Sequence, residues 1–246
     1  MVEFTLPKNS RVTTGKTWPK PAGAANVKEF KIYRWNPDRP DESVTRIPCS
    51  VDGVYSFAVH PDGRTLAAGL SSGAVLLLDA GTGKLIRHHA GHGQNVYDVA
   101  FSPDGTAVAS TCRDGRVTVR ATDTFDELHQ LYLPSDARRV LFTPDDRFLV
   151  TASYDGEVTL WDRANGYRRA ASHHLGRGEL TNIQCRPDAT QLACGTRSHG
   201  LKVWAIRGQD ELPTPNTSGC TQSVAYSPDS RWLATARPPS QRTRWA

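Results

Sequence analysis

The chain has 246 residues, 38% of them hydrophobic and 22% charged, and a formal net charge of +5. The Lys and Arg residues are not gathered into runs with interleaved aromatics, so a nucleic-acid partner is not expected. No apolar stretch of about 18 residues or signal-peptide core is present, so insertion into a membrane is not expected either and a cytoplasmic protein is predicted.

The first 42 residues differ in pattern from the rest. Residues 1–25 are rich in Pro, Thr, Lys and Gly, which is typical of an extended arm. The alternation from Phe30 to Trp35 predicts one strand. The following Asn36-Pro37-Asp38 predicts the turn that ends it.

Residues 1–42 resemble the N-terminus of bacterial succinate dehydrogenase iron–sulfur subunits, most specifically at Lys-Ile-Tyr-Arg-Trp-Asn-Pro-Asp, residues 31–38. The resemblance implies a strand that opens a ferredoxin-like electron-transfer domain. Cluster binding needs closely grouped Cys thiolates, and no such group follows Glu42. We expect a fusion of this leader to another domain, whether natural or produced by gene-model or assembly error. The alternative is an arm that docks to the dehydrogenase complex.

A Pro-Asp phrase recurs five times in the remainder of the chain. Its prolines are 41–43 residues apart, at Pro61, Pro103, Pro144, Pro187 and Pro228. A fixed period of this size predicts a supersecondary unit that is stacked repeatedly.

Each unit has the same internal order, which the second copy illustrates. Alternating apolar residues predict a strand at 96–101, and Pro-Asp-Gly predicts the turn that follows it. A second strand is predicted at 107–111, an Asp114-Gly115 hairpin after it, and a third strand at 117–119. A more polar fourth strand, such as 84–88 in the first copy, leads to the next unit.

These units resemble WD repeats. The resemblance is carried by Gly91-His92, the Pro-Asp-Gly turns and Leu160-Trp161-Asp162. It implies an all-β WD-repeat β-propeller, with four full blades and a partial fifth over about residues 43–236. Residues 43–246 are accordingly predicted to be an incomplete propeller domain behind the 1–42 leader.

The pattern at the end of the sequence predicts an unfinished array. Ser43–Ile47 is a candidate outer strand for closing the ring. After Ala236 the sequence continues Arg237-Pro238-Pro239, which does not suit a central strand. We expect a propeller that is open, or closed by self-association with a second copy.

The WD-repeat family links a His, a Ser or Thr, an Asp and a Trp by hydrogen bonds inside each blade. The resemblance implies that each copy here keeps only part of this network, because Arg120 replaces the Trp in the second copy and Leu133 replaces the His in the third. The fourth copy lacks the Asp and offers His174 as its His. A partial network predicts modest stability. The expected members are structural and not catalytic: His92, Ser110, Asp114, Thr151, Asp155, Trp161 and Trp204.

Propellers of this family bind partners on the face around the central channel, where the residue entering each first strand points. Tyr and Arg are enriched at binding hot spots. The residues at these positions are therefore predicted to form a rim that binds a protein or peptide. The alternative is that they are ordinary solvated loop residues. By alignment on the Pro-Asp turns, these positions are Tyr55, Tyr97, Arg138, Thr181 and Gln222.

Catalytic, metal and cofactor signatures are weak. The His residues cluster at 88–92 and 173–174, but no third metal ligand has a recognisable spacing. Residues 81–84 lack the full phosphate-loop spacing. The five cysteines contain no Cys-x-x-Cys and are expected to be reduced. The sequence predicts a non-enzymatic interaction scaffold or regulatory module without a cofactor or metal. The alternative is a component of the succinate dehydrogenase complex.

Overall fold

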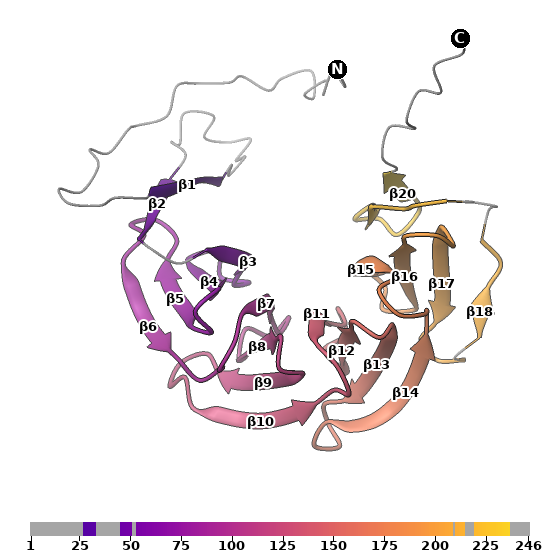
Figure 1. Cartoon of the computed structure of the whole chain (residues 1–246), viewed down its shortest axis with the longest axis horizontal. Coiled ribbons are helices and arrows are strands. Elements are labelled where there is room, and N and C mark those ends of the chain that lie inside the picture. The colour runs from indigo at the N-terminus through magenta and orange to yellow at the C-terminus, as the bar shows by residue number, and fades with distance from the viewer. Residues whose placement is uncertain (1–26, 33–44, 51–52, 209, 215–218, 237–246) are drawn as a thin grey trace, which may run out of the picture.

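The computed structural model describes residues 27–32, 45–50, 53–208, 210–214 and 219–236. This part of the chain contains strands and no helix, and so is all-β as predicted. It holds four four-stranded and two two-stranded antiparallel sheets. The four-stranded sheets follow one another round an arc (Figure 1), with one strand of each on the concave side.

The strands of the first two four-stranded sheets pair in chain order. They are β3 (Val54–Val59), β4 (Thr65–Leu70), β5 (Val75–Asp79) and β6 (Leu85–His89), followed by β7 (Val96–Phe101), β8 (Ala107–Cys112), β9 (Arg116–Ala121) and β10 (Glu127–Tyr132).

The next two sheets repeat this order, and a strand pair follows them. Their strands are β11 (Ala137–Phe142), β12 (Phe148–Ser153), β13 (Glu157–Asp162), β14 (Arg168–His174), β15 (Leu180–Cys185), β16 (Gln191–Thr196), β17 (Leu201–Ala205), β18 (Glu211–Leu212), β19 (Ser223–Tyr226) and β20 (Leu233–Ala236).

The Pro-Asp phrase forms the turn between the first two strands of each sheet. In the second sheet the Asp104 carboxylate accepts hydrogen bonds from the Ser102 hydroxyl at 2.6 Å and the Thr106 backbone N–H at 2.9 Å. The next position has a positive φ in all five turns, whether it is glycine, as in Gly105 (74°), or not, as in Ala189 (57°). The Asp side chain therefore holds this backbone shape even where glycine is absent.

The hairpin between the second and third strands requires glycine because the chain crosses it on the way to the next sheet. Gly156 has a φ of 96°, and a Cβ there would lie 2.0 Å from the Gly176 carbonyl oxygen. The backbone N–H of Leu175 donates to the Gly156 carbonyl at 2.8 Å. This close approach fixes each sheet against the loop that enters its neighbour.

The hydrophobic core lies between neighbouring sheets and not at one centre. One cluster joins β4 and β5 to β7 and β8 around Leu77 and Val96. A second joins β8 and β9 to β11 and β12 around Val119 and Leu149. A third joins β12 and β13 to the β15–β17 sheet around Leu160. Each repeat thus buries its apolar faces only by stacking, as the period predicted.

The segment before the first four-stranded sheet differs from prediction in two places. The strand expected at Phe30–Trp35 overlaps β1 (Val27–Ile32), which begins three residues earlier, and residues 33–44 lie outside the described part. The Ser43–Ile47 segment, expected as the ring-closing outer strand, contributes to β2 (Thr45–Ser50), which pairs with β1 in an antiparallel register. β1 is close to β2 in the sequence, and β2 pairs with β1 and not with the β19–β20 sheet.

The expectation that the chain stops continuing its blade after Ala236 falls on residues 237–246, which are outside the described part. Within the described residues, no helix is long and apolar enough to cross a membrane.

Candidate partner-binding site

The concave-side strand of each four-stranded sheet begins with a β-bulge. The strand register skips one residue between Val54 and Ser56, and the same irregularity recurs at the start of β7, β11 and β15. A bulged residue leaves the ladder, and its side chain is re-aimed. The four skipped residues are Tyr55, Tyr97, Arg138 and Thr181, which are four of the five predicted rim positions.

The fifth predicted position, Gln222, is different. It precedes β19, whose pairing with β20 has no such register shift. Its side chain is exposed, and its backbone N–H donates to the Ala236 carbonyl at 2.8 Å. The structure therefore does not bring Gln222 together with the other four.

The four bulge residues share one pocket of about 450 Å³, which we call the rim pocket. Its wall comes from four successive sheets, at the ends of their concave-side strands and the neighbouring hairpins. The lining residues are Tyr55, Tyr97, Arg138, Arg139, Ser153, Tyr154, Gly178, Leu180, Thr181 and Arg197.

Aromatic rings hold the cationic centre of the rim pocket in place. The Tyr55 and Tyr97 rings meet edge to face with centroids 5.6 Å apart. The Arg138 guanidinium lies 4.3 Å from the Tyr97 ring centroid and 4.9 Å from that of Tyr154. Its Nη2 also donates to the Asp136 carboxylate at 3.0 Å. These contacts fix the guanidinium before any partner arrives.

A carboxylate that the sequence reasoning missed ties three sheets together beside the pocket. Asp98 accepts from the Ser56 hydroxyl at 2.6 Å and from the Val140 backbone N–H at 3.1 Å. Burial raises the pKa of Asp98, and the hydrogen bond from Ser56 opposes that shift. Arg139 connects the third sheet to the fourth, because its side chain donates a hydrogen bond to the Thr181 carbonyl at 3.3 Å. Each of these side chains comes directly after a bulge residue, a positional signal that was present in the repeat alignment.

The polar network inside the blades is partial, and each sheet keeps a different fragment. In the second sheet the His92 Nε2 and the Ser110 Oγ are 2.8 Å apart, and both residues are buried. In the third, the Trp161 indole N–H donates to the Thr151 Oγ1 at 2.8 Å. Asp155 instead accepts from the Ser153 hydroxyl.

The positions that depart from the family pattern have found other partners. Arg120, at the expected Trp position, is buried and donates to the Phe125 carbonyl at 3.0 Å and to Glu127 at 3.1 Å. Trp204 stacks on His173 with centroids 4.6 Å apart. His174 is exposed on the outer strand β14, so its expected place in the fourth network is wrong; its neighbour His173 reaches the tryptophan instead.

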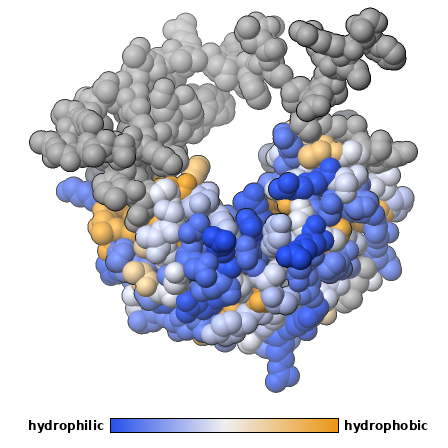
Figure 2. All heavy atoms as spheres, in the orientation of Figure 1, coloured by the Kyte–Doolittle hydropathy of each residue, from blue (hydrophilic) through white to orange (hydrophobic). Residues whose placement is uncertain are grey.

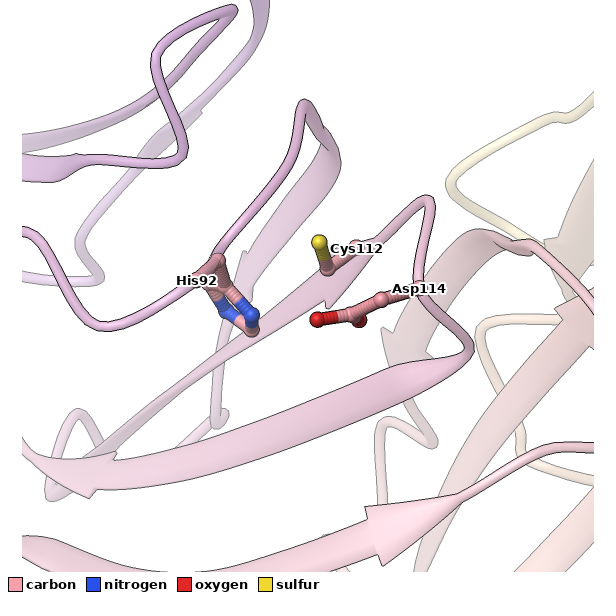
Figure 3. A group of neighbouring side chains, drawn as sticks. All are labelled: His92, Cys112 and Asp114. Atoms are coloured by element: carbon pink, nitrogen blue, oxygen red, sulfur yellow. The ribbon is translucent and has the colours of Figure 1, made fainter.

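Figure 3 shows the one group of neighbouring His, Cys and Asp side chains found in the described residues: His92, Cys112 and Asp114. Burial lowers the pKa of His92 to about 4 and raises that of the Cys112 thiol to about 11. The thiol donates to the Gln94 carbonyl at 3.3 Å, and Asp114 accepts from the Arg116 backbone N–H at 2.9 Å. These hydrogen bonds join the group to the loop before β7 and to the β8–β9 hairpin.

Repeated four-stranded blades, Pro-Asp turns and fragments of one polar network define a β-propeller protein. The family model for "WD domain, G-beta repeat" matches residues 42–79, 83–119 and 128–162. This part of the chain therefore consists of WD repeats. The structure adds the sheet β15–β18, which has the same order beyond the last matched segment.

Relatives fall into two groups. Thirty-eight residues are 71% identical to the succinate dehydrogenase iron–sulfur subunit of Paracoccus denitrificans, covering 15% of each chain. Echinoderm microtubule-associated protein-like 2 of Homo sapiens is 30% identical over 71% of this chain and 29% of its own length. Telomerase protein component 1 of Rattus norvegicus is 30% identical over 60% of this chain and 6% of its own length. The chain thus spans less than a third of each.

Proposed function

We propose that this chain is a non-catalytic interaction scaffold or regulatory module, which binds a protein or peptide in the rim pocket. The observation that carries the proposal is the repeated bulge, which directs Tyr55, Tyr97, Arg138 and Thr181 into one pocket from four sheets. WD-repeat proteins are typically non-enzymatic scaffolds, and Tyr and Arg are the side chains enriched in binding hot spots.

Capture from a lysate of the source cells by the tagged chain tests this proposal. The triple variant Y55A/Y97A/R138A should lose the captured proteins, while Y132A/R207A should keep them. Tyr132 is 69% exposed on the outer strand β10, and Arg207 is exposed beyond β17. Circular dichroism confirms that both variants are folded. Equal capture by the folded triple variant and the control contradicts the proposal.

We propose a cytoplasmic location and, in addition, self-association through the β19–β20 sheet. Trp232 beside β20 is 74% exposed, and β19 is the only strand that pairs with β20 in the described residues. An unpaired strand edge with an exposed aromatic favours association. Sedimentation should show a concentration-dependent dimer that Trp232→Ser weakens; a monomer at all concentrations contradicts this part.

The 38-residue match favours a second candidate, a role in the succinate dehydrogenase complex. Iron and acid-labile sulfide analysis separates the two, because an electron-transfer subunit contains a cluster and a scaffold does not. We propose that the match reflects a fusion near residue 42. Sequencing genomic DNA and transcripts across this junction should find it intact if the fusion is natural, and interrupted if it arose in assembly.

A further inference from the structure

The wall of the rim pocket is cationic. Three arginines line it, Arg138, Arg139 and Arg197, and no Asp or Glu does. A fourth, Arg177, places its guanidinium 5.7 Å from the centroid of the lining Tyr154 ring. Figure 2 shows strongly hydrophilic side chains along the concave side of the arc.

This charge is only partly neutralised by the protein itself. Arg138 pairs with Asp136, but no ion pair joins Arg139, Arg177 or Arg197 to a carboxylate within the described residues. Asp98 acts on Arg139 electrostatically from its place beneath the rim, where burial raises its pKa. Arg197 and Arg177 are exposed. The pocket therefore presents a positive field in a concave site, where the field is focused.

Arg138 also keeps hydrogen-bonding capacity. Within the described part of the chain its Nη2 donates to Asp136, and 37% of the side chain remains exposed to an incoming oxyanion. The rings of Tyr97 and Tyr154 both lie against the guanidinium, with centroids 4.3 Å and 4.9 Å from its central carbon. A guanidinium fixed in this way suits a planar or tetrahedral oxyanion, because its donors form a rigid fork.

We propose that the rim pocket binds an anionic side chain of a partner peptide, either a carboxylate or a phosphate. This inference rests on the proposed function, since it names the chemistry of the partner for the same pocket. Arg138 and Arg197 contact the oxyanion, and the Tyr55 and Tyr97 rings pack against the residues that flank it. Tyr55 is 53% exposed and offers its ring for this contact.

Binding to three immobilised decapeptide libraries with randomised flanks tests the inference with the full chain. The libraries carry Glu, phosphoserine or Gln at the centre. We expect the Glu or phosphoserine library to retain about ten-fold more protein than the Gln library. The excess should fall as salt rises, because the charges are partly exposed. The preferred anionic library identifies which oxyanion is favoured.

Two single variants locate the effect. Arg197→Gln should reduce the anionic excess by about five-fold, since it removes one charge from an exposed position. Arg207→Gln, at the opposite end of the same strand pair, should leave the excess unchanged. Equal retention on all three libraries, or an equal loss in both variants, overturns the anionic inference.

Failure of this inference is distinguishable from failure of the proposed function. If Y55A/Y97A/R138A abolishes partner capture while the libraries show no anionic preference, the rim pocket is a partner site for a neutral segment. If capture and library retention are both unaffected by that triple variant, both proposals are wrong.

Discussion

The hydrogen bond from Trp161 to Thr151 is the best point at which to measure what the partial blade network contributes. The bond is 2.8 Å long, and Thr151 is 1% exposed. Trp161→Phe removes the donor and leaves the hydroxyl buried without its partner. A typical net hydrogen bond contributes about 1 kcal/mol, and an unpaired buried polar group costs about 1–3 kcal/mol. We therefore expect the variant to lose about 1–3 kcal/mol of unfolding free energy, apart from the lost ring area.

A double-mutant cycle with Thr151→Val isolates the bond, because the double variant has neither partner. Urea denaturation of the four proteins should give a coupling energy of about 1 kcal/mol. Trp204→Phe in the Thr151→Val background is the matched control and should be additive, since Trp204 stacks on His173 and makes no bond to Thr151. A Trp161–Thr151 coupling below about 0.3 kcal/mol refutes the reasoning.

Three further predictions concern stability. Burial lowers the pKa of His92 from 6.5 to about 4, so protonation of this residue favours the unfolded chain. The unfolding free energy should therefore fall by up to about 3 kcal/mol as the pH drops from about 6.5 to about 4. The fall should be smaller in His92→Gln, and an equal dependence on pH in both proteins would contradict this. Arg163 bridges two Pro-Asp turns through ion pairs with Asp104 and Asp146. Arg163→Ala should lower the unfolding free energy, measured by urea denaturation, by about 1–2 kcal/mol. A decrease below about 0.3 kcal/mol would show that the bridge does not stabilise the fold. Asp98→Ala should lower the unfolding free energy by about 2–4 kcal/mol because it leaves the Val140 N–H and the half-buried Ser56 hydroxyl without their acceptor, whereas an unchanged unfolding free energy would contradict the role of Asp98 in joining the sheets.

The repeat predicted the architecture because its signals are local. Pro-Asp turns and Asp-Gly hairpins set backbone geometry within a few residues, so the strand order within each sheet followed from them. The alignment on Pro-Asp turns also selected the four bulge residues, since the bulge occurs at a constant distance before each turn. Gln222 differs because its sheet has only two strands in the described part and no bulge.

What the sequence did not predict depends on contacts between repeats. Asp98 is one polar residue among many in the alternating strands, and its role appears only when Ser56 and Val140 come from the two adjacent sheets. Tyr154 joins the pocket from a hairpin, a position that the alignment did not single out. The pairing of β2 with β1 was likewise not predicted, because β1 lies upstream of the repeats.

Photocrosslinking from the rim pocket tests the central claim most directly. Benzoylphenylalanine is placed at Tyr55, inside the pocket, or at Tyr132, a more exposed tyrosine on an outer strand. After irradiation in cells, we predict a defined higher-mass adduct from position 55, with the partner identified by mass spectrometry, and none from position 132. Adducts from position 132 alone, or the same adducts from both positions, would contradict the assignment of the rim pocket as the partner-binding site.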